Sequence, residues 1–282
     1  MYRLNWVPIL GTAVWLGLAL GSSAANADAA PTPAHEEAAD PRTPAVVPFG
    51  VGERATYQVR LGRLGSVGEG TMHISGIEIV DSRPTYRTQL QIRGGIPLAR
   101  VDDTFESWID VHGLFSRRYH QDQKEVRFER QRKFDFFPER RTFRRTDTGE
   151  TGTLPTDRPL DEVSFLYYAR TLPLRVGETY TLNQYFRDDG NPVVLRVLRR
   201  ETVRVPAGTF NTIVVQPVIR TRGLFGEGGQ AEVFFSDDER RILVQMRSRV
   251  RLVGSLSLHL QEYQAGRPYV ATPSQPVRTS GE

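Results

Sequence analysis

The sequence predicts a mainly β protein built on an antiparallel sheet, with one helix near residues 160–172. Apolar and polar residues alternate with a period of two through much of the chain, as they do in strands with one apolar and one solvated face. Clusters of glycine, proline and aspartate separate these runs, as expected where antiparallel strands turn. The chain has no cysteine, so its stability must come from a hydrophobic core.

The first element in the chain is a predicted signal peptide, residues 1–27. Arg3 precedes an apolar run from Val7 to Leu20, and Ala25-Asn26-Ala27 fits an A-x-A cleavage site. The alternative is an uncleaved membrane anchor, but a run of about 14 residues is short for a spanning helix, which needs about 20. Lipid attachment at a cleavage-site cysteine is excluded, because there is no cysteine. We therefore expect cleavage and a periplasmic or secreted mature protein.

Three further segments follow the signal peptide. Residues 28–46 are rich in alanine, proline and acidic residues, which predicts a disordered linker. Residues 47–265 carry the alternating pattern and form a single β-rich domain. Residues 266–282 are predicted to be a flexible tail. No later stretch is long and apolar enough to cross a bilayer, so the mature form is not expected to span a membrane.

Within the domain, the clearest alternating runs begin at Tyr57, Tyr86, Val193, Ile242 and Leu256. Pro206-Ala207-Gly208 predicts a tight turn between two strands, because proline fixes φ and glycine permits a positive φ. The strand that follows, with Phe210 and then Ile213 to Val215, is expected to be buried on both faces.

One segment departs from the β pattern. From Leu160 to Arg170 the apolar residues follow helical spacing, Asp161 and Glu162 favour a helix start, and Pro173 favours a stop. This helix separates two halves, opened by Val51-Gly52-Glu53 and by Val176-Gly177-Glu178. We interpret them as a duplicated meander of roughly five strands per half. Chance similarity between β hairpins is the alternative.

In these motifs the chain resembles an exported bacterial family known as domain of unknown function 3108. The resemblance rests on Val51-Gly52-Glu53, on Asp161 to Tyr168 with Leu172-Pro173-Leu174, on Val176-Gly177-Glu178, and on Val205 to Thr212. It covers about residues 47–263. It implies a signal peptide and a strongly curved antiparallel sheet, a half-barrel or open barrel similar to periplasmic lipoprotein and lipid carriers. It implies no catalytic residue, because the family is uncharacterised.

No motif in the domain predicts a catalytic, cofactor-binding or metal site. The glycine-rich segments 62–70 and 223–229 lack the Gly-Lys-Ser/Thr ending of a phosphate-binding loop and are better explained as connections between strands. Neither paired zinc-ligand histidines nor a G-x-S-x-G elbow is present. The pair Asp102-Asp103 should point to opposite faces of a strand, and the pairs Asp188-Asp189 and Asp237-Asp238 lie in predicted turns.

The stretch from Arg117 to Arg145 holds eleven basic and five acidic residues with aromatic residues between them. Its simplest explanation is a pair of long exposed strands whose arginine stems cover the edges of the core. The functional alternative is a surface for anionic lipid headgroups or an acidic partner. The formal net charge of +4 hints at nucleic acid, but basic and acidic residues are interspersed as on solvated strand faces. Nucleic acid is therefore not an expected partner of this exported protein.

These observations favour a non-enzymatic periplasmic protein that binds or carries a lipid or other apolar ligand in a concave sheet face. That expectation rests on fold analogy. An envelope assembly or structural protein, docking another protein through an exposed strand edge or the basic strands, is the alternative. A cell-envelope hydrolase is the third, and it requires polar groups that converge in one pocket.

Overall fold

The computed structural model describes residues 46–96, 99–125, 128–219, 231–250 and 254–270. The predicted signal peptide lies outside the described residues, as does the predicted linker except for residue 46. The described part belongs to one compact unit. Within it, no helix has the length and apolar character needed to cross a bilayer.

All of the named strands belong to one antiparallel sheet of 14 strands. The first eight are β1 (Arg54–Leu61), β2 (Gly65–Val80), β3 (Arg83–Ile96), β4 (Ala99–Asp110), β5 (Ser116–Glu125), β6 (Phe128–Phe137), β7 (Thr142–Arg145) and β8 (Thr151–Thr153). The last six are β9 (Thr179–Leu182), β10 (Val193–Val205), β11 (Gly208–Val218), β12 (Ala231–Ser236), β13 (Leu243–Val250) and β14 (Gly254–Gln264). Between the two sets lies α1 (Glu162–Ala169), and short 3-10 turns occur at Gly62–Leu64, Pro138–Arg140 and Asp188–Gly190.

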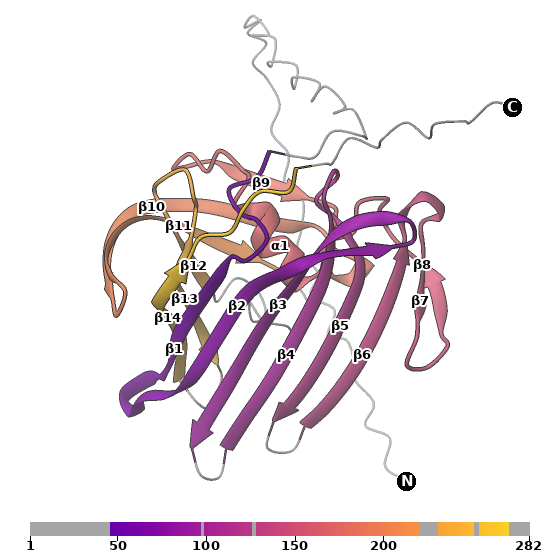
Figure 1. Cartoon of the computed structure of the whole chain (residues 1–282). Coiled ribbons are helices and arrows are strands. Elements are labelled where there is room, and N and C mark those ends of the chain that lie inside the picture. Colours follow the sequence, from indigo (N-terminus) through magenta and orange to yellow (C-terminus); the bar gives the residue numbers. More distant parts are fainter. Residues whose placement is uncertain (1–45, 97–98, 126–127, 220–230, 251–253, 271–282) are drawn as a thin grey trace, which may run out of the picture. The chain divides into compact units, whose positions relative to one another are not determined.

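The strand order is β8-β7-β6-β5-β4-β3-β2-β1-β14-β13-β12-β11-β10-β9. Strands β1 to β8 pair in sequence order and form one meander, and strands β9 to β14 do the same and form a second. The two meanders are joined by the pairing of β1 with β14 (Figure 1). The mainly β antiparallel fold with one helix is confirmed. The prediction of about five strands per half is wrong, because eight strands precede α1 and six follow it. The sheet stays open, with β8 and β9 as its edges.

The strand register separates an inner face from an outer face. In the first meander, Leu90, Phe105 and Gln121 lie opposite one another on adjacent strands and are buried, so they share the inner face, on which α1 packs. On the outer face, Arg87, Trp108 and Arg118 are aligned in the same way. The Trp108 indole lies between the two guanidinium groups, at 5.5 and 5.6 Å. The period-two alternation of the sequence thus corresponds to one core face and one solvated face.

The second meander folds back on itself. The Ala207 amide, at the tip of the β10–β11 hairpin, donates to the Leu260 carbonyl on β14 at 3.0 Å. In the sheet order β11 and β14 are separated by β12 and β13, so this bond requires strong curvature. The turn is as predicted, with Gly208 at φ 131°, and Ile213, Val214 and Val215 are fully buried, whereas Phe210 is only half-buried.

The helix α1 is fixed at its start by buried polar groups. The Asp161 carboxylate accepts hydrogen bonds from the amides of Val163 and Ser164 and from the hydroxyls of Ser107 and Ser116, the latter two at 2.6 and 2.7 Å. Burial raises the pKa of Asp161 to about 6. The helix ends at Ala169, before Pro173 is reached, and it is therefore shorter than the helical pattern from 160 to 172. The side chain of Arg170, its C-cap residue, is buried.

Candidate functional site

The strand β14 continues past the end of its neighbour β13. The pairing of β14 with β13 stops at His259, whereas its pairing with β1 continues to Gln264. On the β13 side, no strand pairing is described beyond His259, and the Leu260 carbonyl accepts a hydrogen bond from the Ala207 amide. Because alternate backbone groups of a strand point to opposite sides, the stretch from Gln261 to Gln264 presents a free strand edge.

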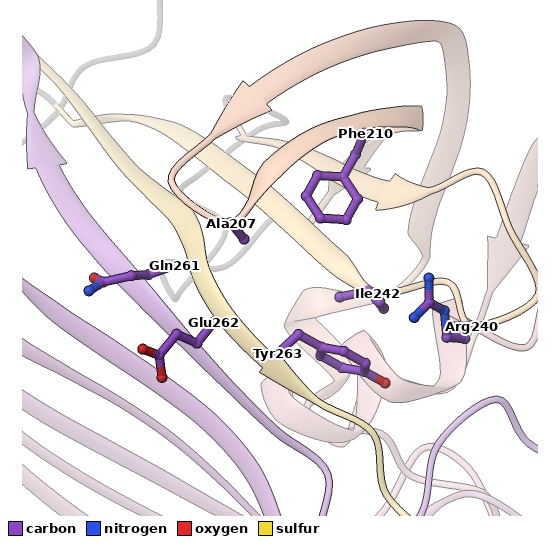
Figure 2. Close-up of a pocket in the computed structure, with 7 residues that line it drawn as sticks. All are labelled: Ala207, Phe210, Arg240, Ile242, Gln261, Glu262 and Tyr263. Atoms are coloured by element: carbon purple, nitrogen blue, oxygen red, sulfur yellow. The ribbon is translucent and has the colours of Figure 1, made fainter.

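A cavity of about 510 Å³ lies against this edge. It is lined by Ala207, Phe210, Arg240, Ile242, Gln261, Glu262 and Tyr263, and we refer to it as the seam. A second strand edge reaches it, since the β11–β12 pairing begins only at Thr212 and leaves Phe210 beyond it. Figure 2 shows the rings of Phe210 and Tyr263 and the side chain of Ile242 directed toward one another from separate segments, while Gln261 points away.

The floor of the seam rests on a buried ion pair. Tyr263 donates its hydroxyl to Glu53 Oε2 at 3.0 Å. Arg170 donates to both oxygens of Glu53, at 2.6 and 3.0 Å, and also to the carbonyl of Arg240 at 3.0 Å. One guanidinium group therefore ties the end of α1 to the segment before β1 and to the loop that lines the seam.

The surroundings of this ion pair stabilise the positive charge of Arg170 and the protonated hydroxyl of Tyr263. Burial opposes the positive charge of Arg170, but the hydrogen bonds and charge of Glu53 outweigh it and raise the pKa of Arg170. Burial, and then the negative charge of Glu53, raise the pKa of Tyr263 to about 12. Tyr263 is therefore a protonated donor at neutral pH, and the Glu53 carboxylate is fully engaged by its neighbours.

A second cavity lies where β3 ends and β4 begins. It measures about 620 Å³ and is lined by Arg93, Gly94, Gly95, Arg100, Val101, Asp102 and Lys124. Arg93 and Asp102 form an ion pair at 3.0 Å, with half or more of each side chain exposed. This cavity is thus open to solvent, and its basic lining is partly neutralised by Asp102.

The structure does not bring the described histidines together into one site. Burial and nearby arginines lower the pKa of His259 to about 4, and burial also lowers the pKa of His73 and His120. His35 lies outside the described residues. Among the described residues, no group of three or more histidine or acidic side chains could hold a metal ion.

The predicted acidic pairs also lie apart. Asp102 is exposed and Asp103 is buried, in accord with opposite faces of β4. Asp188 and Asp189 are in the 3-10 turn before β10, and Asp237 and Asp238 are in the turn after β12.

The basic stretch from Arg117 to Arg145 is divided between the two faces of β5, β6 and β7. Arg118 lies on the outer face and is paired with Asp135. Arg132 and Arg145 lie on the inner face, opposite Gln121 and Phe134. The glycine-rich segment 62–70 spans a 3-10 turn and the start of β2, whereas residues 223–229 lie outside the described residues.

Sequence reasoning did not find the seam. Its residues come from three distant segments, and the free edge exists only because β13 and β14 differ in length and register. The nearest sequence signal was the turn at Pro206-Ala207-Gly208, which places the hairpin tip but does not say what it contacts.

The fold and the seam define a class of protein: an open, curved antiparallel β-sheet with a surface cavity between strand edges. The family model described as protein of unknown function, DUF3108, matches residues 56–261. The chain belongs to this family.

Three solved structures are similar to the chain. A β-barrel-like protein of domain of unknown function DUF1849 from Brucella abortus has 13% identity and a TM-score of 0.49, covering 77% of this chain and 98% of that one. A candidate lipoprotein from Parabacteroides distasonis has 10% identity and a TM-score of 0.35, covering 79% and 100%. A candidate exported protein with a YmcC-like fold from Bacteroides fragilis has 11% identity and a TM-score of 0.28, with the same coverage. Comparison with curated proteins gives no match.

Proposed function

We propose that this protein is a non-catalytic binding protein of the cell envelope that accepts an extended segment of another protein as an added strand in the seam. The observation that carries the proposal is the free edge of β14 from Gln261 to Gln264, which borders a cavity of about 510 Å³. Strand addition uses main-chain hydrogen bonds for affinity and side-chain pockets for specificity.

The seam supplies both main-chain hydrogen-bonding groups and a pocket for side chains. The backbone of β14 offers the hydrogen-bonding groups, and Phe210 and Ile242 offer apolar contact for a side chain of the incoming segment. Glu262 is exposed at its rim, where Arg240 is paired with Asp238 at 2.9 Å. The buried ion pair between Arg170 and Glu53 holds the surrounding segments together, so the site is preorganised and little ordering is needed on binding.

The packing of the inner face favours this proposal over a carrier of apolar ligands. The carrier hypothesis places its ligand in the concave face of the sheet. The side chains of Val163, Phe165, Leu166 and Tyr167 on α1 are buried in the core cluster on that face. The two cavities described above are both open and rimmed by charged side chains. Export to the envelope is part of the proposal and rests on the sequence pattern of residues 1–27.

Site-specific crosslinking in cells tests the proposal. A photoreactive phenylalanine analogue at Phe210, whose ring is directed into the seam, should capture a recurrent partner, and the same residue at Gln131, exposed on the outer face of β6, should not. Ala207→Trp, which fills the seam, should abolish the Phe210 crosslink, while Thr148→Trp in the exposed β7–β8 turn should leave it unchanged.

The captured partner then allows a decisive measurement. Amide hydrogen exchange should slow in the purified complex at those residues of Gln261–Gln264 whose amides face the free edge, since strand addition protects them. Equal crosslinking from both positions, or unchanged exchange at these residues, would contradict the proposal. A lipid that co-purifies without a protein partner in native mass spectrometry would favour the carrier instead.

A further inference from the structure

One end of the first meander carries an exposed surface that is both basic and apolar. Alternate turns of a meander lie at the same end of the sheet, so the β1–β2 turn lies beside the end of β3 and the start of β4 (Figure 1). The tip patch, as we call this surface, consists of four exposed residues: Arg60, Arg63, Leu64 and Arg100. The inference does not rest on the proposed function, because the tip patch shares no residue with the seam.

The β1–β2 turn projects from the sheet into solvent. It is the 3-10 turn Gly62–Leu64, and Gly62 and Gly65 have φ 44° and 77°, which glycine adopts without strain. Beyond the adjoining residues, no described atom lies within 4 Å of a Cβ added at either glycine. Leu64, in this turn, is 62% exposed. A large apolar side chain held in solvent is stabilised when it enters an apolar environment.

The charged row that borders the tip patch is neutralised by its own members. It lies on the outer face of β2 to β6 and consists of Glu69, Arg93, Asp102, Lys124 and Glu129. Acidic and basic residues alternate along it, and Arg93 pairs with Asp102 at 3.0 Å. This row therefore has no excess positive charge to attract an anion.

The arginines of the tip patch lie closer to the end of the sheet than this row. Arg60 and Arg100 are each two residues nearer that end, and Arg63 lies in the turn itself. None of the three forms an ion pair with a described carboxylate. Arg100 also lines the open cavity of about 620 Å³. A guanidinium group without a carboxylate partner keeps donors available for phosphate oxygens.

The spacing of these arginines fits an extended anionic surface. Arg60 is on β1 and Arg100 is on β4, three strands away. Neighbouring strands are about 4.8 Å apart, so the two backbones are separated by about 14 Å. Both side chains project from the outer face, which places the two positive charges over separate anionic groups.

We propose that the tip patch docks the protein on the surface of a bilayer that contains anionic phospholipid. The three arginines contact phosphate groups, and Leu64 enters the boundary between the headgroups and the acyl chains. Basic side chains are attracted to an anionic leaflet, and an apolar side chain adds the burial of its surface. The combination of free arginines with a projecting leucine thus matches the two layers of the bilayer surface.

Docking at this end leaves the seam accessible. Strand β14 runs from Leu256, opposite Leu61 beside the tip patch, to Tyr263 in the seam. At a rise of about 3.4 Å per residue, Tyr263 lies about 24 Å further from the tip than Leu256. The seam then faces away from the bilayer.

The first test removes two charges from either end of the sheet. Protein produced without residues 1–27 is sedimented with vesicles of phosphatidylcholine alone or of phosphatidylcholine and phosphatidylglycerol in equal parts. The double variant Arg63→Gln, Arg100→Gln should weaken binding to the anionic vesicles at least about tenfold. The control, Arg83→Gln with Arg204→Gln, changes two exposed arginines at the opposite end and should weaken it by less than about twofold.

The second test removes the apolar contact. Leu64→Ser should weaken binding at least about fivefold, because less apolar surface enters the bilayer. Ile79→Ser, at a residue that is 67% exposed at the opposite end of β2, should leave binding unchanged. All of these positions are exposed, so each variant should unfold at the temperature of the wild type.

Three results would overturn the proposal. They are equal binding of the wild type to both kinds of vesicle, equal losses in the tip and control variants, and no binding to the anionic vesicles. The last result would favour an acidic protein as the partner of the tip patch.

Discussion

Arg170 is a single residue on which three parts of the chain depend. Its side chain is 2% exposed and that of Glu53 is 5% exposed, and the two residues are 117 positions apart. Its guanidinium group also lies 5.2 Å from the ring centre of Phe49 and 5.5 Å from that of Tyr167. A buried charge of this kind is tolerated only because the opposite charge and several acceptors accompany it.

Loss of the Glu53 charge should therefore lower the stability of the fold. We expect Glu53→Gln to lower the free energy of unfolding by about 3–5 kcal/mol, because it leaves the Arg170 charge buried without its counterion. Urea denaturation monitored by circular dichroism measures the loss. The double variant Glu53→Gln, Arg170→Met should recover part of it, because no uncompensated charge remains.

The matched control is Arg175→Met, which removes an arginine from an ion pair with Glu178 whose side chains are 76% and 40% exposed. Its effect should stay below about 1 kcal/mol, as expected of a solvated pair. A loss in Glu53→Gln no larger than in this control would show that the buried pair contributes little.

At the scale of elements, the β10–β11 hairpin links the core of the second meander to the seam. Its turn is short, and Gly208 has φ 131°, a conformation that L side chains rarely adopt. Beyond the turn, the buried strand segment from Ile213 to Val215 fixes the hairpin against its neighbours. The hairpin tip then contacts β14 through Ala207.

We expect Gly208→Ala to lower the free energy of unfolding by about 1–3 kcal/mol, because a Cβ strains the backbone at this φ. Gly76→Ala in β2 is the control, since that position has no positive φ and no atom within 4 Å of an added Cβ. It should be neutral or stabilising by up to about 1 kcal/mol. Thermal unfolding of the two variants distinguishes these outcomes, and equal losses would refute the role of the turn.

Features that depend on local contacts were predictable from the sequence, and features that depend on distant contacts were not. The helix start at Asp161 and the turn at Gly208 were predictable, because capping and positive φ are local properties of the chain. The number of strands per half was not, since β7, β8 and β9 have only three or four residues each and little periodicity. The seam and the pair of Glu53 with Arg170 depend on contacts between distant segments, which no local pattern specifies.

At the scale of the whole molecule, the two meanders are joined through the centre of the sheet. Every residue of β1 is paired with β14, and the Tyr57 hydroxyl donates to the Leu243 carbonyl at 3.1 Å across that junction. One hydrophobic cluster includes Leu90 and Phe105 from the first meander and Val215 and Phe235 from the second. The predicted duplication of the sequence thus does not produce two separate cores.

We therefore expect the meanders to unfold in one cooperative transition. Trp108 is the only tryptophan after residue 27, so in protein produced without residues 1–27 its fluorescence reports on the first meander. Circular dichroism reports on the strands of both. The two signals should change at the same urea concentration, and separate midpoints would show that the meanders are independent folding units.

The junction of β1 and β14 also has a topological consequence. Val51 and Arg267 exchange two backbone hydrogen bonds, at 2.9 and 2.8 Å, so the places where the chain enters and leaves the domain are adjacent. The edges of the sheet lie instead in the middle of the sequence, at β8 and β9. Because the two ends of the domain are adjacent, a link between them would close the polypeptide into a ring. The strand pairing does not require the chain to begin and end at these positions. A circular permutant with Val51 and Arg267 linked, and with new ends at the exposed turn of Thr148, retains every strand pairing of the native domain.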